Sequence, residues 1–261
     1  MLSRNLDEAR KAFEHGDAKA SRKAHDHAGI EEHRDGGGRY LKSSIYGGLD
    51  GIITTFAVVA GVAGASLETG IVLILGFANL IADGLAMAFG EFLSSKAERE
   101  FHAAERARET WEFENHPEGE KQELIELYVE KGLSTEEATQ VVEIFATKKE
   151  AMVDIMMVEE LGLFEDDTPP LGNALATFLS FVVFGFVPLL SYVATEWLGL
   201  NWQQFPLACG LTALTLFALG AFKVRFTQRP WMTSGLEMML VGGIAALVAF
   251  GIGHGLSGLA D

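Results

Sequence analysis

The sequence predicts an all-α membrane protein with five transmembrane helices and an acidic helical domain inserted between the second and third of them. Three observations support this fold class. The 261 residues have a mean hydropathy of +0.20 and 49% are hydrophobic, yet the formal net charge is −16. Residues 94–170 contain 21 acidic and 8 basic side chains and therefore carry −13 of that charge. The remainder is apolar and glycine-rich, as expected of membrane helices that flank one polar insert.

Five apolar stretches have the length of a membrane-spanning helix. Each is close to the roughly 20 residues that a helix needs to cross a hydrocarbon core about 30 Å thick. The chain is therefore divided into a polar tail (1–38), spans one and two (39–93), the insert (94–170) and spans three to five (171–261). The expected spans cover residues 41–65, 70–93, 171–195, 204–226 and 231–256.

The placement of Lys and Arg predicts the orientation of these spans. All of these residues lie in the tail up to Lys42, in the insert, or near the junction of spans four and five, whereas the other loops and the C-terminal end have none. By the positive-inside rule the N-terminus and the insert face the cytosol. The tail has no apolar signal-peptide region. The acidic balance argues against nucleic acid as a partner, and the single cysteine, Cys209, excludes a disulfide framework.

The insert has the pattern of three helices. Residues 94–115 continue span two as far as a break at Pro117, and residues 118–131 form a second helix that Gly132 ends. Ser134 followed by Glu137 is a capping-box signature, which opens a third helix that we expect to continue to residue 161. Three helices of this size bury only a small core, so we expect the domain to pack on the membrane part or on a second copy.

Ionisable side chains inside the spans are the first candidate functional residues, because a charge in a membrane costs several kcal/mol. Span one contains Asp50 among glycines. In span two, Asp83, Met87 and Glu91 follow one another at four-residue spacing and therefore share one helix face. Carboxylates and a thioether suit a divalent transition metal. The alternatives are a structural hydrogen bond for Asp50, core packing for Met87 and contact with water for Glu91, while Glu237 in span five is explained by snorkelling.

The insert offers a second set of candidate ligands. Pairs of glutamates at a spacing of three residues project from one helix face, and two methionines with a glutamate lie within little more than one turn. The alternative is an ordinary solvated acidic surface. The tail adds histidines at positions 15, 25, 27 and 33, which are either incidental exposed side chains, as is usual, or a weak metal-collecting cluster. A di-iron ferroxidase is disfavoured because the Glu-x-x-His pairs of such sites are missing from the sequence. The candidate ligands of the insert are Glu109, Glu112, Glu120, Glu123, Met156, Met157 and Glu160.

Three motifs give the chain a resemblance to the vacuolar iron transporter family. They are IYGGLDGIITT at residues 45–55, AMAFGEFLS at 86–94 and SGLEM at 234–238. The five-span layout, the acidic insert and the cytosolic N-terminus are similar too, and the resemblance covers nearly everything after Arg39. Two departures from the family pattern are Ala86, where a serine is common, and Asp83, where a small residue is common.

The resemblance implies a homodimer that exchanges Fe²⁺ for protons. By position, Asp50 and Met87 would be the ligands of the ion pathway, and the seven candidate residues of the insert would bind metal before translocation. Asp83 and Glu91 are added to the expected pathway because of their spacing from Met87, not because of the resemblance. We therefore expect a non-enzymatic metal/proton antiporter that exports Fe²⁺, or Mn²⁺, from the cytosol across a bacterial plasma membrane or a vacuolar one. No tightly bound cofactor is expected. The rival functions are a membrane-anchored metal buffer or sensor and, in third place, a ferroxidase.

Overall fold

The computed structural model describes the helical part of the chain and divides it into two compact units, Met1–Lys42 and Ser43–Asp261. The first unit contains α2 (Ala18–Asp26), and a ring nitrogen of His15 lies 2.7 Å from the carbonyl oxygen of Lys11. The other tail histidines fall outside the described side chains, so the prediction about them stays open. The described residues are 11–13, 15–26, 40–164, 168–199, 203–227 and 230–259.

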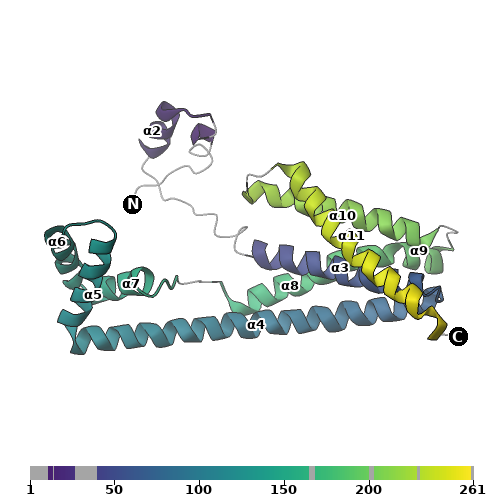
Figure 1. The fold of residues 1–261 in the computed structure, drawn as a ribbon, viewed down its shortest axis with the longest axis horizontal. Helices are drawn as coiled ribbons and strands as arrows, with labels where there is room; N and C mark the ends of the chain where they lie inside the picture. Colours follow the sequence, from purple (N-terminus) through teal and green to yellow (C-terminus); the bar gives the residue numbers. More distant parts are fainter. Residues whose placement is uncertain are drawn as a thin grey trace. The chain divides into compact units, whose positions relative to one another are not determined.

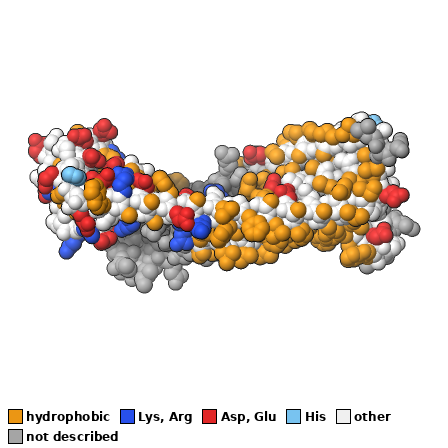
Figure 2. Space-filling view, turned by 90° about the horizontal axis from the view of Figure 1, so that it is seen from below, with side chains coloured by type: hydrophobic (Ala, Val, Ile, Leu, Met, Phe, Trp, Pro, Cys, Tyr) orange, Lys and Arg blue, Asp and Glu red, His pale blue; other side chains and the backbone are white. Residues whose placement is uncertain are grey.

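The second unit is built on five segments that are long and apolar enough to cross a membrane (Figure 1). The all-α fold class and the five spans are thus confirmed, and no strand occurs in the described ranges. Hydrophobic side chains cover this part of the surface, whereas acidic and basic ones gather on the insert (Figure 2). The helices are α3 (Leu41–Gly64), α4 (Thr69–Asn115), α8 (Pro170–Gly185), α9 (Leu190–Leu198), α10 (Gln204–Thr227) and α11 (Trp231–Leu256).

The third span differs from the expected single helix. Helix α8 ends at Gly185, a short 3₁₀ turn covers Val187–Leu189, and α9 begins at Leu190. Pro188 causes this interruption, because proline has no N–H to donate and its ring clashes with the carbonyl one turn before it. The two helices and the turn together still cross as one segment of 28 residues.

Helix α4 connects the membrane part to the insert without a break. Its 47 residues correspond to a length of about 70 Å, more than twice the hydrocarbon thickness. The first half is therefore the second span, and the second half extends beyond the apolar region to carry the insert, as Figure 1 shows. The expected continuation of span two as far as residue 115 is confirmed.

Glycines bring the membrane helices into backbone contact. A side chain at Gly47 or Gly51 of α3 would collide with the backbone of Thr177 or Phe181 of α8. Close approach of this kind is how helices associate in lipid, where burial of apolar surface provides no driving force. The glycines around Asp50 thus fix α3 against α8. Buried residues of several helices, including Val59, Val72, Leu80, Phe181, Leu189 and Tyr192, form one hydrophobic cluster there.

The insert adds α5 (Pro117–Glu130), α6 (Thr135–Ala146) and α7 (Lys149–Glu159) to the end of α4. The predicted capping box is present: Ser134 accepts from the backbone N–H of Glu137, and the Glu137 carboxylate accepts from that of Ser134. The expected third helix is instead two helices, since Lys148 has an extended backbone. The break turns α7 back onto the domain, which buries Met152 and Met156 against Leu124 of α5 and Val142 of α6.

Candidate functional site

Helix α4 displays a polar stripe within its membrane-crossing half. Asp83, Met87 and Glu91 lie one helical turn apart and are all partly buried, and Met87 packs against the hydrophobic cluster of the span helices. Asn79 extends the stripe by one further turn, and its amide nitrogen is buried without a hydrogen-bond partner among the described residues. Sequence reasoning missed Asn79, although the same four-residue spacing would have identified it.

Helix α3 contributes a second carboxylate to this region. Asp50 is partly buried and lies within electrostatic reach of Asp83 on α4. The hydroxyl of Thr54 donates to the backbone carbonyl of Asp50, so Thr54 is satisfied within its own helix. At the insert-facing end of α3, Ser43 donates to Glu91 across 3.2 Å. Acidic groups from two neighbouring helices thus approach one another inside the spans, where mutual repulsion favours a cation between them.

The insert brings glutamates of three helical segments together. Ligand oxygens of Glu109 on α4, Glu120 on α5 and Glu160 at the end of α7 lie within 4.8 Å of one another. Glu112 and Glu123 are close enough to interact electrostatically with this triad. All five glutamates predicted from spacing therefore meet in one region, because α5 and α7 fold back onto the end of α4.

Glu109 and Glu120 of the triad are buried, whereas Glu160 is exposed. Glu109 is 1% exposed and Glu120 is 6% exposed. Three of their four carboxylate oxygens have no hydrogen bond to the described part of the chain, although Arg108 Nη2 lies 2.6 Å from Glu109 Oε1. Burial, together with repulsion by Glu160, raises the pKa of Glu109 to about 7. Burial and repulsion by Glu109 raise the pKa of Glu120 to about 7 in the same way. A divalent cation would relieve both effects.

The two methionines of the predicted ligand set have different surroundings. Met156 is fully buried and packs in the hydrophobic core of the insert. Met157 is 5% exposed and lines a cavity of about 400 Å³ between α4, α7 and the start of α8. The predicted snorkelling residue Glu237 is exposed near the start of α11.

Comparison with known proteins identifies the family. The model of the VIT family matches residues 41–254. A vacuolar iron transporter of Plasmodium falciparum is 42% identical over 97% of this chain and 97% of its own length. The vacuolar iron transporter of Toxoplasma gondii is 41% identical over 96% of this chain and 88% of its own length. Vacuolar iron transporter 1 of Arabidopsis thaliana is 32% identical over 82% and 84%.

These matches decide between the classes of function that the sequence left open. Proteins of the VIT family are transporters and not enzymes, which removes the ferroxidase alternative. The five apolar segments and the match across nearly all of them make the chain a multi-pass membrane protein. The polar stripe of α4 and the acid of α3 lie inside the matched region. The chain belongs to the VIT family of metal transporters.

Proposed function

We propose that the protein moves Fe²⁺, and Mn²⁺ as a second substrate, out of the cytosol in exchange for protons. The observation that carries this proposal is the approach of Asp50 and Asp83 inside the membrane spans, with Met87 one turn along the same stripe. Such acids are costly in lipid and are expected to serve a permeating ion. Relatives named as vacuolar iron transporters support Fe²⁺ as the metal.

The donor chemistry supports both the metal class and the coupling to protons. Carboxylate oxygens attract hard divalent cations, and the thioether of Met87 shifts preference towards softer ions such as Fe²⁺ and away from Mg²⁺ and Ca²⁺. A protonated carboxyl group is a poor metal ligand, so protons arriving from the far side release the metal there. Asp50 and Asp83 then bind the metal ion and protons alternately, which couples the two movements in opposite directions.

The insert gathers metal before translocation. In this proposal the glutamate triad binds the ion, and Glu112, Glu123 and Met157 adjust the site, whereas Met156 supports it only by packing in the hydrophobic core of the insert. The distribution of Lys and Arg supports a cytosolic insert, in the bacterial plasma membrane or in a vacuolar one. The stripe of α4 is only partly buried in one chain. A second copy would enclose it, and we therefore propose a homodimer.

Reconstitution into liposomes tests the proposal against a metal buffer that merely sits in the membrane. The protein should accumulate Fe²⁺ inside the vesicles under anaerobic conditions, and Asp50→Ala should abolish this uptake. The double variant Glu109→Gln/Glu120→Gln should weaken loading at low metal concentration and retain uptake at high concentration. Binding of Fe²⁺ by the vesicles without transfer to their interior would instead identify a buffer.

A further inference from the structure

Arg108 of α4 lies among the acids of the insert site, and its guanidinium contacts several of them. Nη1 lies 2.6 Å from Glu112, and Nη2 lies 2.6 Å from Glu109 and 2.9 Å from Glu105. Glu109 and Glu112 belong to the predicted ligand set, whereas Glu105 does not. Arg108 is also close enough to act electrostatically on Glu160. A cation of the chain itself therefore stands among the charges that would attract a divalent metal ion.

The contacts of Arg108 differ in kind. Nε donates a hydrogen bond to Glu105 across 3.0 Å, and Nη1 donates one to Glu112 across 2.6 Å. Glu109 faces Nη2 only as an ion pair, and neither of its oxygens accepts a hydrogen bond from the residues that the structure describes. Aligned hydrogen bonds of a guanidinium are stronger than unaligned contacts. Glu109 is thus the contact that Arg108 loses at the lowest cost.

Glu105 offers Arg108 a place to withdraw to. It lies one turn before Arg108 on the same helix face, and both Nε and Nη2 of the guanidinium reach its carboxylate. Glu105 is not one of the three acids that meet at the triad. The side chain of Arg108 is 43% exposed, so it has room to turn away from the triad while it keeps its bonds to Glu105.

We infer that Arg108 is a tethered counter-cation that competes with the metal ion for Glu109 and Glu112, and that it withdraws to Glu105 when the metal binds. This inference rests on the proposed role of the insert in binding metal. A competitor on the same helix has a high effective concentration at the site, so it lowers the metal affinity without a second molecule. A lowered affinity suits a site that must pass its ion on, because an ion that is bound too tightly does not leave.

A double-mutant cycle between Glu105 and Arg108 tests this exchange in the purified full-length protein, with Mn²⁺ as the probe. Glu105→Gln should weaken Mn²⁺ binding by roughly three- to fivefold, because Arg108 then has no other acid to withdraw to. In the background Arg108→Gln the same change should alter the affinity by less than about twofold. Electron paramagnetic resonance of the free Mn²⁺ measures both affinities. Equal weakening in the two backgrounds, or none in either, would overturn the inference.

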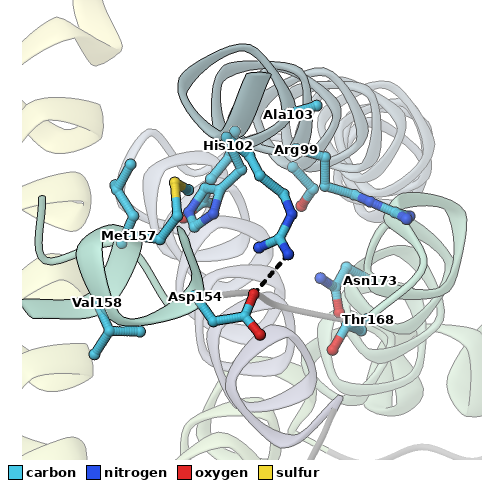
Figure 3. Close-up of a pocket in the computed structure, with 12 residues that line it drawn as sticks. Arg99, His102, Ala103, Asp154, Met157, Val158, Thr168 and Asn173 are labelled. Carbon is cyan, nitrogen blue, oxygen red and sulfur yellow. Dashed lines mark ion pairs between the residues drawn. The ribbon is translucent and has the colours of Figure 1, made fainter. Parts of the chain in front are cut away.

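Arg106 provides a matched control on the same helix. Its guanidinium lies 2.6 Å from Asp154 and 3.4 Å from Glu150 of α7, and neither acid is a candidate ligand. The dashed line at Asp154 in Figure 3 marks the first of these pairs, which borders the cavity between α4, α7 and the beginning of α8. Arg106→Gln removes the same charge as Arg108→Gln and should change the Mn²⁺ affinity by less than about twofold. Tightening as large as that in Arg108→Gln would reveal a general charge effect and would overturn the inference.

Transport separates failure of this exchange from failure of the proposed function. In liposomes, Arg108→Gln should lower the half-saturating Mn²⁺ concentration and the maximal uptake rate, each by roughly three- to fivefold, because the ion binds more tightly and leaves more slowly. Unchanged values of both would contradict a competing role of Arg108. Hydrogen exchange of α6, which contains none of the candidate ligands, checks that the variants fold. If the unaltered protein bound Mn²⁺ and transported none, the proposed function would be wrong, and the binding cycle would still decide the role of Arg108.

Discussion

Replacing Glu109 with glutamine tests how the insert is poised to receive metal. Burial and repulsion by Glu160 raise the pKa of Glu109 from 4.5 to about 7. A shift of this size corresponds to about 3 kcal/mol of destabilisation when the carboxylate is ionised. The pKa of Glu109 is higher in the folded state than in the unfolded one. Relative to the ionised form, the protonated carboxyl therefore stabilises the fold fully below pH 4.5, and this stabilisation is lost as the pH rises to about 7. The metal-free insert should therefore be least stable in weakly alkaline buffer.

Glu109→Gln removes this charge and should raise the local opening free energy of α5 and α7 by up to about 3 kcal/mol at pH 8, with almost no change at pH 4. Hydrogen exchange of the full-length protein in detergent with a chelator measures that free energy. With saturating Mn²⁺ the unaltered protein should have the higher opening free energy of the two, because only its intact triad binds the ion strongly. Glu118→Gln is the control, since Glu118 is 84% exposed. Unchanged protection at pH 8 in Glu109→Gln would refute the claim that burial of this charge destabilises the domain.

Three further variants test other parts of the account. Arg108→Gln removes the cation that pairs with Glu109 and lowers its pKa. Because a metal ion no longer shares the carboxylate with this cation, Mn²⁺ should bind the triad several-fold more tightly at pH 8. Weaker binding in a calorimetric titration would show that Arg108 supports the site instead. Ser134→Ala should lower the opening free energy of α6 by about 1 kcal/mol in hydrogen exchange, and Ser134→Asp should restore it. Equal protection in the unaltered protein and both variants would contradict the role of the capping box. Gly51→Val should destabilise the membrane part by about 1–3 kcal/mol through overpacking against α8, whereas Gly243→Val, which meets open space, should have little effect on the melting temperature; similar melting of the two variants would argue against close packing of α3.

The sequence predicts the membrane architecture well because apolar length is a local property. The five spans, the continuous helix through the end of span two and the capping box at Ser134 all follow from residues close together in the chain. Two helix breaks were not predicted, for different reasons. Pro188 was a visible local signal within span three, whereas the break at Lys148 has no proline or glycine to indicate it. That second break is set by tertiary packing, because it turns Met152 and Met156 into the core of the insert.

Residue spacing in the sequence predicts only part of the candidate sites. Four-residue and three-residue periods identify which acids share a helix face, and they indicated the stripe of α4 and the glutamate pairs of the insert. Spacing does not reveal which faces of different helices meet. The approach of Asp50 to Asp83, the hydrogen bond from Ser43 to Glu91 and the cavity beside Met157 all depend on contacts between segments distant in the sequence.

Simultaneous measurement of metal and proton movement in one vesicle population tests the central claim, that acids inside the spans carry both ions. Liposomes with the insert facing outwards and an acidic interior should take up Fe²⁺ while their interior becomes less acidic. Asp50→Asn, which keeps the size of the side chain and loses its charge, should abolish both signals together. Uptake of Fe²⁺ by the unaltered protein without proton movement, or undiminished exchange in Asp50→Asn, would contradict the account.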